Sequence, residues 1–329
     1  MLSVVIPTRN RAVLLAAALE SLQTQRLSPS EFEVLVVDNG SEDDTKGIVT
    51  SFQSRMKNLR YFFEPAPGLH VGRHRGMKEA RGEVIVYADD DIVATPSWLE
   101  AIADCFRSPA VAMVGGNNLP RFEGAPPNWL QKLWAKPVFG GRAIPYLSIL
   151  ELPPGRRSVS PFLIWGCNFS VRKRVLVDAG GFHPDSMPED WIRFRGDGET
   201  HVSFYVYRMG LESCFDSRAS VYHTVPASRM TIEYFSRRAF NQGISDSYTH
   251  LRNAPQSRAR RVVRNMVAKS RRLVGGVVTR LRDIAQSDPE LRTLASAIRE
   301  GYRRGYAYHQ RAYREDPEVR AWVHKPDYF

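Results

Sequence analysis

The sequence predicts an α/β protein with a mostly parallel sheet, and two features of the chain carry this prediction. Up to residue 115, short runs rich in Val, Ile and Leu alternate with longer stretches of helical periodicity. The runs 34–37 and 84–87 are continuously apolar, as expected for parallel strands that are buried on both faces. The 329 residues, of which 43% are hydrophobic, are enough for a packed core and about two structural units.

Each predicted element of the first half follows from its own stretch of sequence. Apolar, β-rich runs predict strands, and apolar residues at helical spacing predict helices. The predicted strands are residues 2–6, 33–37, 59–63, 84–88 and 110–115. The predicted helices between them are residues 12–24, 42–56, 71–80 and 97–107, and Ser41 is the expected N-cap of the second helix.

The second half of the chain is less regular. Between residues 117 and 160 the periodicity fails and Pro, Gly and Trp accumulate, which predicts a long loop. After it we expect a short ordered stretch at 162–171, helices at 173–179 and 200–209, a strand at 212–221 and a mainly helical region from about residue 231. The chain therefore divides into an α/β unit, residues 1–230 with halves 1–116 and 117–230, and a helical extension, residues 231–329.

The composition and the missing motifs exclude several classes of protein. No run approaches the ~18 consecutive apolar residues of a membrane-spanning helix. The N-terminus lacks the pattern of a secretory signal, which predicts a cytoplasmic protein. Cys105, Cys167 and Cys214 are too far apart for a disulfide framework or a clustered zinc site, so we expect buried thiols. A Gly-Lys-Ser/Thr phosphate loop and a Gly-x-Gly-x-x-Gly turn are both absent, which argues against P-loop enzymes and dinucleotide dehydrogenases.

The basic charge of the chain is concentrated in one segment. Of the net charge of +11, nine charges come from residues 258–282, which contain no acidic residue. Apolar residues recur at helical spacing within 258–285, which predicts a basic amphipathic helix. Such a helix either lies on an anionic membrane surface or packs its apolar side on the α/β unit. Because the rest of the chain is nearly balanced in charge, we expect no nucleic-acid partner.

Polar residues follow three of the predicted strands, at the edge where parallel sheets bind ligands. Residues 7–10 follow the first strand, 38–41 the second, and Asp89, Asp90 and Asp91 come directly after the fourth. Three successive carboxylates repel one another unless a cation neutralises them, and a hard divalent ion such as Mg²⁺ or Mn²⁺ is the natural partner. The alternative is a solvated acidic turn that caps the following helix.

Taken in order, the motifs of this chain resemble those of the family 2 glycosyltransferases, which have the GT-A fold. The residues that carry the resemblance are 3–11, 36–45, 67–69 with Arg73 and Gly76, 89–91, 165–172 and 180–182. The resemblance covers about residues 1–225. It implies an inverting enzyme, dependent on Mn²⁺ or Mg²⁺, that moves a sugar from a nucleotide-sugar donor to a hydroxyl group.

The resemblance also implies roles for single residues around the donor. Pro7 and Arg9 would line the nucleotide pocket, and Asp38 would hydrogen-bond the base. Arg73 would lie near the base or the diphosphate, and Asp89 and Asp90 would contribute to binding the nucleotide sugar. Asp91 is the expected direct metal ligand. The sequence departs from the family at His74, where Asn is usual, which puts that local contact in doubt.

The catalytic base and a further metal ligand come from the second half of the resemblance. Counting back from Gly210 places Glu199 at the position of the family's catalytic carboxylate, and Asp197 is the rival. A carboxylate at a helix N-terminus is favoured by the helix dipole and can accept a proton from an attacking hydroxyl; the alternative is that both acids only cap the helix. His223 follows a strand-forming run and is either a third metal ligand or an ordinary strand-end histidine.

The acceptor is the least defined part of the prediction. Trp165, Asn168 and Trp191 are expected to shape its site, since sugars stack on aromatic faces, although each Trp can equally belong to the core. We expect a UDP-sugar as donor and a glycan or lipid-linked acceptor in polysaccharide synthesis. The alternatives are a GT-A-like scaffold without catalysis, which would lack a key carboxylate, and a sugar nucleotidyltransferase, which would need a Gly-rich basic loop after the first strand.

Overall fold

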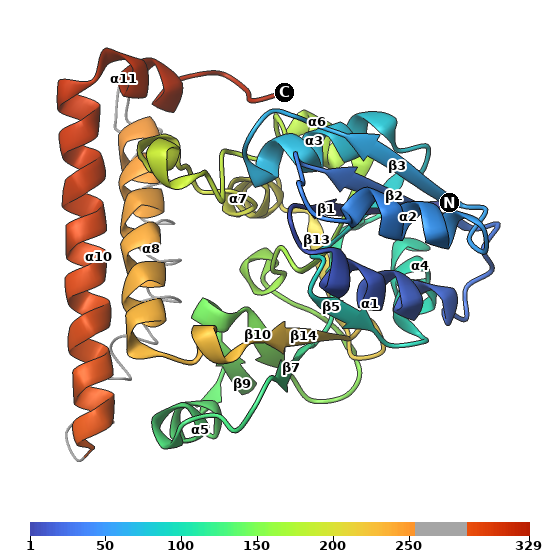
Figure 1. Ribbon diagram of the computed structural model, residues 1–329, viewed down its shortest axis with the longest axis horizontal. Coiled ribbons are helices and arrows are strands. Elements are labelled where there is room, and N and C mark those ends of the chain that lie inside the picture. Colours follow the sequence, from blue (N-terminus) through green and yellow to red (C-terminus); the bar gives the residue numbers. More distant parts are fainter. Residues whose placement is uncertain (254–287) are drawn as a thin grey trace.

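The computed structural model describes residues 1–253 and 288–329 of the chain. An α/β unit and an arm of long helices lie side by side (Figure 1). The predicted fold class is confirmed: the structure is mixed α/β, with sheets flanked by helices and a helical C-terminal region.

The main sheet has eight strands, and its register brings the predicted site residues to one edge. Strands β1, β2, β3 and β4 are mutually parallel, and β12 is antiparallel to both β4 and β6. Thr8 lies opposite Asp38, and Asn168 lies opposite Ala88. The residues that follow β1, β2 and β4 and those that precede β12 therefore meet at the same edge of the sheet. The order across the sheet is β11 (Arg156–Ser158), β13 (Glu212–Asp216), β6 (Val111–Gly115), β12 (Asn168–Arg172), β4 (Val84–Ala88), β1 (Leu2–Thr8), β2 (Phe32–Asp38) and β3 (Leu59–Phe63).

Helices cover both faces of this sheet because its strands alternate their side chains between two apolar clusters. Val4 and Ile6 pack into one cluster with residues of α1 and α4, whereas Val5 packs into the other with residues of α3, α6 and α7. The strands predicted in the first half are confirmed to within two residues. The helices are α1 (Ala12–Gln23), α2 (Thr45–Gln53), α3 (Leu69–Glu79), α4 (Trp98–Phe106), α6 (Lys173–Asp178) and α7 (Thr200–Arg208).

The predicted N-cap of the second helix is wrong. Helix α2 begins at Thr45, and the Asp43 carboxylate accepts a hydrogen bond from the Thr45 backbone N–H at 3.1 Å. The Ser41 hydroxyl instead accepts a hydrogen bond from the backbone N–H of Asn10 at 3.0 Å. Asp and Ser are both good caps, so the sequence alone placed the start too early.

The predicted long loop at 117–160 is also wrong. It supplies four of the six strands of a second sheet, which sequence reasoning missed because these strands are only two to five residues long. The predicted strand 212–221 is in fact two strands, β13 and β14, which belong to different sheets. The second sheet has the order β5 (Ile92–Ala94), β14 (Val221–Val225), β7 (Asn118–Phe122), β10 (Ile149–Glu151), β9 (Gly141–Ile144) and β8 (Pro137–Val138), and α5 (Asn128–Trp134) joins two of them.

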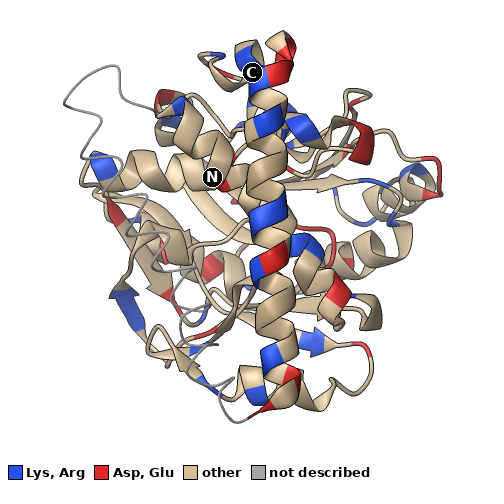
Figure 2. Cartoon of the chain, turned by 90° about the vertical axis from the view of Figure 1, so that its left-hand side faces the viewer, with Lys and Arg blue, Asp and Glu red and all other residues tan. Residues whose placement is uncertain are grey.

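The helical arm consists of α8 (Ile232–Arg252), α10 (Pro289–Glu315) and α11 (Pro317–Val323). Helices α8 and α10 pack closely because glycines face the contact: a Cβ at Gly305 would lie 1.9 Å from the Phe240 carbonyl oxygen. Figure 2 looks onto the arm, and basic residues are spread along the outer helix α10. Short 3₁₀ turns complete the described elements, η1 (Pro145–Leu147), η2 (Pro161–Leu163), η3 (Glu189–Phe194) and η4 (Ala227–Arg229).

Three predictions about the rest of the chain have different outcomes. The expected buried thiols are confirmed, since Cys105, Cys167 and Cys214 are all free and buried. The predicted amphipathic segment 258–285 lies outside the described residues. Within the part of the chain that the structure describes, no helix has both the length and the apolar character to cross a membrane.

Candidate functional site

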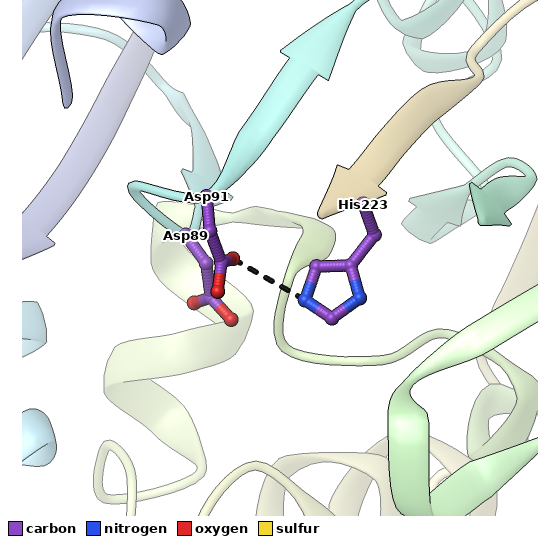
Figure 3. A group of neighbouring side chains, drawn as sticks. All are labelled: Asp89, Asp91 and His223. Atoms are coloured by element: carbon purple, nitrogen blue, oxygen red, sulfur yellow. Dashed lines mark ion pairs between the residues drawn. The ribbon is translucent and has the colours of Figure 1, made fainter. Parts of the chain in front are cut away.

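Three side chains with metal-binding atoms meet where β4 ends. Asp89 and Asp91 follow β4 directly, and His223 lies in β14, which pairs with β5 so that His223 is opposite Ile92. The ligand atoms of the three residues all lie within 4.8 Å of one another (Figure 3). The closest pair is Asp91 Oδ1 and His223 Nε2, at 3.2 Å. Strand pairing within the second sheet therefore brings together residues that are more than 130 positions apart in the sequence.

Arginines neutralise part of this acidic cluster. Arg11 contacts Asp90 at 2.6 Å and Asp91 at 3.1 Å, and Arg229 contacts Asp91 at 3.1 Å. Burial raises the pKa of Asp90 to about 6, although Arg11 and the hydroxyl of Thr8 oppose the shift. Burial would also raise the pKa of Asp91, but the contact with His223 and the two arginines bring it below the usual range.

The residues present fit a divalent metal ion. His223 Nδ1 is buried without a hydrogen-bond partner among the described residues, and Asp91 Oδ1 has the contact with His223 Nε2 but no hydrogen bond of good geometry there. Burial, together with the negative charge of Asp91, raises the pKa of Asp89, so an added cation would relieve repulsion between the two carboxylates. Two carboxylate oxygens and one imidazole nitrogen suit Mn²⁺ or Mg²⁺.

A cavity of about 410 Å³ opens next to this cluster. Five of the residues predicted to bind the nucleotide sugar line it: Pro7, Arg9, Arg73, Asp89 and Asp90. Asp38 does not line it. Its carboxylate accepts hydrogen bonds from the Ser41 backbone N–H and the Tyr61 hydroxyl, both at 2.8 Å, and its base-binding role stays a prediction.

Glu199, the predicted base, lies at the start of α7, where its carboxylate has two defined contacts. One oxygen is 3.4 Å from Arg73 Nη1, and the other accepts a hydrogen bond from the Gly166 backbone N–H at 3.3 Å. The same arginine donates a hydrogen bond to the Gly166 carbonyl at 3.3 Å and lies 3.7 Å from Asp89. Arg73 therefore links the base to the acidic cluster, and the backbone of Gly166 holds both side chains.

A second cavity, of about 210 Å³, adjoins the first, and the two share several lining residues. Glu199 is 27% exposed at its side chain and lines both cavities, as do Ser148, Asp185 and Arg238. A carboxylate between two adjoining cavities can accept a proton from a group in one of them while a second molecule occupies the other.

Asp197, the rival for the catalytic role, is more firmly tied into the protein. Its carboxylate contacts His183 Nδ1 at 2.5 Å and accepts a hydrogen bond from the Thr249 hydroxyl at 2.7 Å. Burial would raise the pKa of Asp197, but His183 and Thr249 lower it to about 2. It lines only the second cavity, whereas Glu199 lines both.

The three predicted acceptor residues lie in different environments. Trp165 lines the second cavity. Asn168 is 1% exposed, and its amide joins the Trp98 indole N–H to the Ala219 carbonyl inside the core. Trp191, in η3, is 47% exposed and lines neither cavity. Of the three, only Trp165 lies next to Glu199.

Sequence reasoning assigned no role to several residues of the site. Arg11 belongs to the first motif that carries the resemblance, two residues after Arg9. Its contacts with the acidic cluster could not be read from the sequence. Arg229 and Arg238 lie beyond the residues that carry the resemblance, and nothing in their local sequence marks them. His74, the departure from the family pattern, accepts a hydrogen bond from the Phe182 backbone N–H and contacts the Tyr328 carbonyl.

Solved structures share this architecture. A mannosyltransferase from Pyrobaculum calidifontis, described in complex with GDP-Man and Mn²⁺, aligns with a TM-score of 0.57 and 17% identity over 96% of this chain and 87% of its own. TarS from S. aureus aligns with a TM-score of 0.50 and 17% identity over 95% of this chain and 55% of its own. At such identity the likeness shows the fold, and the fold together with the site defines a protein of the GT-A class.

The family follows from the sequence comparison. The chain belongs to glycosyl transferase family 2, whose model matches residues 3–176, more than half of its length. Validoxylamine A glucosyltransferase of Streptomyces hygroscopicus subsp. limoneus is 28% identical over 201 residues, 56% of this chain and 44% of that protein. A GalNAc(5)-diNAcBac-PP-undecaprenol beta-1,3-glucosyltransferase of Campylobacter jejuni is 37% identical over 92 residues, 27% of this chain and 29% of that protein. The matches span less than half the length of these relatives.

Proposed function

We propose that the protein is an inverting, metal-dependent glycosyltransferase that moves a sugar from a nucleoside-diphosphate donor, a UDP-sugar by family resemblance, to a hydroxyl of a glycan or lipid-linked acceptor. One observation carries the proposal: Glu199 lines both the cavity that contains the Asp89, Asp91 and His223 cluster and a second cavity without such a cluster. In an inverting transfer the attacking hydroxyl approaches the anomeric carbon from the side opposite the leaving diphosphate while the base takes its proton, and a carboxylate shared by adjoining donor and acceptor cavities suits this task.

The metal ion and the arginines have separate tasks in this proposal. Asp89, Asp91 and His223 would hold the ion, which when bound stabilises negative charge on the leaving diphosphate. Arg9, Arg11 and Arg229 line the same cavity and add positive charge along it. The mannosyltransferase of similar fold, described with GDP-Man and Mn²⁺, supports a metal and a nucleotide sugar as a class but not the choice of base or sugar.

The acceptor hydroxyl is activated by Glu199. Its carboxylate is positioned by the Gly166 N–H and by Arg73, so it keeps one orientation while it accepts the proton. Asp197 is the weaker candidate, because its side chain is only 7% exposed, against 27% for Glu199, and it lines the second cavity but not the first.

Binding of the donor nucleotide tests the first half of the proposal. We would measure the thermal unfolding of the protein with UDP, GDP, dTDP or CMP, each with Mn²⁺ or with EDTA. A ligand that binds only the native state raises the unfolding temperature, so one nucleotide should give a shift that requires the metal. No shift with any nucleotide would contradict the proposed donor site and favour a scaffold without catalysis.

A pair of variants tests the base. Glu199→Gln should keep the metal-dependent nucleotide shift but lose turnover of the matching sugar nucleotide, measured as release of the nucleoside diphosphate. Glu212→Gln is the matched control, since Glu212 is an exposed acid at the start of β13 and lines neither cavity. Full turnover in Glu199→Gln would remove Glu199 from the mechanism.

A further inference from the structure

The second cavity has two chemically different walls. One wall is aromatic and apolar, with Phe162, Leu163, Trp165 and Phe204, and the rings of Phe162 and Phe204 meet edge to face at 4.9 Å. The opposite wall is polar and comes mainly from one face of α8, at Arg238, Gln242, Ser245, Asp246 and Thr249. An aromatic surface facing a few polar groups suits a sugar ring, which has apolar C–H faces and polar edges. At about 210 Å³ the cavity is below the range of ~300–1,000 Å³ that holds drug-sized ligands, so it fits one ring.

Every carboxylate that lines this cavity already has a partner. Asp185 forms an ion pair with Arg195, and Glu199 contacts Arg73. Asp246 accepts hydrogen bonds from the Gln242 amide and the Tyr302 hydroxyl, and Asp197 is held by His183 and Thr249. Asp185 and Glu199 are thus paired with arginines, whereas Asp197 and Asp246 are held by hydrogen bonds.

Arg238 is different from these residues. Its guanidinium forms no ion pair or hydrogen bond within residues 1–253 and 288–329, and its Nε is a buried donor without a partner. A partly buried cation without a counter-ion is costly, and an anionic ligand removes this cost. Guanidinium groups bind carboxylate and phosphate oxygens in a two-pronged geometry, so the chemistry of the missing partner is an anionic oxygen group.

Arg238 lines both cavities, and two observations favour the second cavity for the anion. Arg238 precedes Gln242 by one turn of α8 and Ser245 by two, so it belongs to the same polar wall. Burial would raise the pKa of Asp185, but Arg195, Arg73 and Arg238 lower it, which places Arg238 in the electrostatic field of this cavity. The first cavity already has Arg9, Arg11 and Arg229, in addition to its metal cluster, to receive a diphosphate.

We propose that the second cavity binds the acceptor as a single sugar ring that carries a carboxylate or phosphate group, and that Arg238 binds this anionic group while a ring hydroxyl reaches Glu199. The inference rests on the proposed function, because it takes Glu199 as the base. Arg238 is then a specificity-determining residue: it selects an acidic acceptor over a neutral one without taking part in the proton transfer.

Ligand titrations on the full chain test this inference. Binding of methyl β-D-glucuronide, D-glucose 6-phosphate and methyl β-D-glucoside would be measured by saturation-transfer NMR at constant ionic strength, with and without UDP and Mn²⁺. At least one anionic sugar should bind roughly 10-fold or more tightly than the glucoside, as expected for a charged hydrogen bond. The two anionic probes distinguish a carboxylate from a phosphate.

Two neighbouring arginines provide the variant and its control. Arg238→Gln should abolish the preference for the anionic sugar and keep the unfolding temperature and the metal-dependent UDP shift of the wild type. Arg237→Gln should keep the preference, because Arg237 is exposed, points to the ring of Tyr234 and lines neither of the two cavities.

Each alternative result has a distinct meaning. Equal binding of neutral and anionic sugars by the wild type would overturn the inference, and so would a preference that survives in Arg238→Gln. Loss of the UDP shift in Arg238→Gln would also overturn it, because Arg238 would then serve the donor. Absence of a nucleotide shift in the wild type would refute the proposed function alone, since the titrations without nucleotide still report on the second cavity.

Discussion

Replacing Asn168 by alanine separates a structural role from a role in acceptor binding. Asn168 Oδ1 accepts a hydrogen bond from the Trp98 indole N–H at 2.9 Å, and Nδ2 donates one to the Ala219 carbonyl at 2.9 Å. Trp98 and Ala219 are fully buried, and Asn168 is 1% exposed. The amide therefore joins α4 and the segment before β14 to strand β12, at the point where the acidic cluster is built.

The size of the effect follows from the groups left behind. Asn168→Ala would leave one buried N–H and one buried carbonyl without partners, each costing about 1–3 kcal/mol. We expect a loss of about 2–5 kcal/mol in the free energy of unfolding, measured by urea denaturation followed by circular dichroism. Asn58→Ala is the control: Asn58 also donates to a backbone carbonyl, that of Phe32, but it is half-buried and water can replace it. Its expected cost is below ~1 kcal/mol.

Two results would refute the structural role of Asn168. One is a free energy of unfolding within ~0.5 kcal/mol of the wild type, which would mean that water or a neighbour satisfies both buried groups. The other is unchanged stability together with weaker binding of the sugar probes, which would return Asn168 to the acceptor site.

Four further outcomes are expected. Glu199→Gln should lower turnover by roughly 10²–10⁴-fold, the usual contribution of a positioned base, and turnover within a factor of two of the wild type would contradict this. Asp91→Asn should remove the manganese-dependent part of the nucleotide-induced shift in unfolding temperature. The metal site would be contradicted if calorimetry on the wild type found the same UDP affinity with Mn²⁺ and with EDTA. Gly305→Ala should lower the unfolding temperature measurably, because the new Cβ would meet the Phe240 carbonyl and force α8 and α10 apart; unchanged melting would show that the helices adjust freely. Stability should also fall as the pH drops below ~6.5, because burial lowers the pKa of four histidines to about 3 or 4. These histidines stay neutral in the folded protein while the unfolded chain takes up protons, and each changes the free energy of unfolding by about 1.4 kcal/mol per pH unit in this window. A urea midpoint that is constant from pH 7.5 to 5 would contradict this expectation. These residues are His70, His74, His201 and His309.

The first half of the fold could be predicted because its elements are defined by local patterns. Strands β1, β2 and β4 are buried along their whole length and rich in apolar residues, and helices fill the intervals between the first strands. The second sheet could not be predicted in this way. Strands β8 and β10 have only two and three residues, and β10 is held by pairing with the more distant β7 and by packing against α5 and α8.

The site shows the same division. The residues directly after β1 and β4 were predictable, because the end of a parallel strand marks the binding edge. The tertiary contacts were not: the pairing of β14 with β5 that brings His223 to Asp91, and the position of Arg229, depend on the second sheet. Whether Asn168 lies in the core or in the acceptor site could not be read from its motif either, because an asparagine amide can bind buried backbone groups as well as sugar hydroxyls.

Helix α8 lies beyond residues 3–176, the part of the chain that matches the family model, yet it supplies most of the polar wall of the second cavity. The strand ends that build the first cavity, at β1 and β4, lie within that match. Within α8, Gln242, Ser245, Asp246 and Thr249 line only the second of these two cavities, whereas Arg238 lines both. Substitutions at the first four positions would therefore reshape the second cavity and leave the first intact, which makes this stretch of the arm the part to exchange when such a scaffold is engineered.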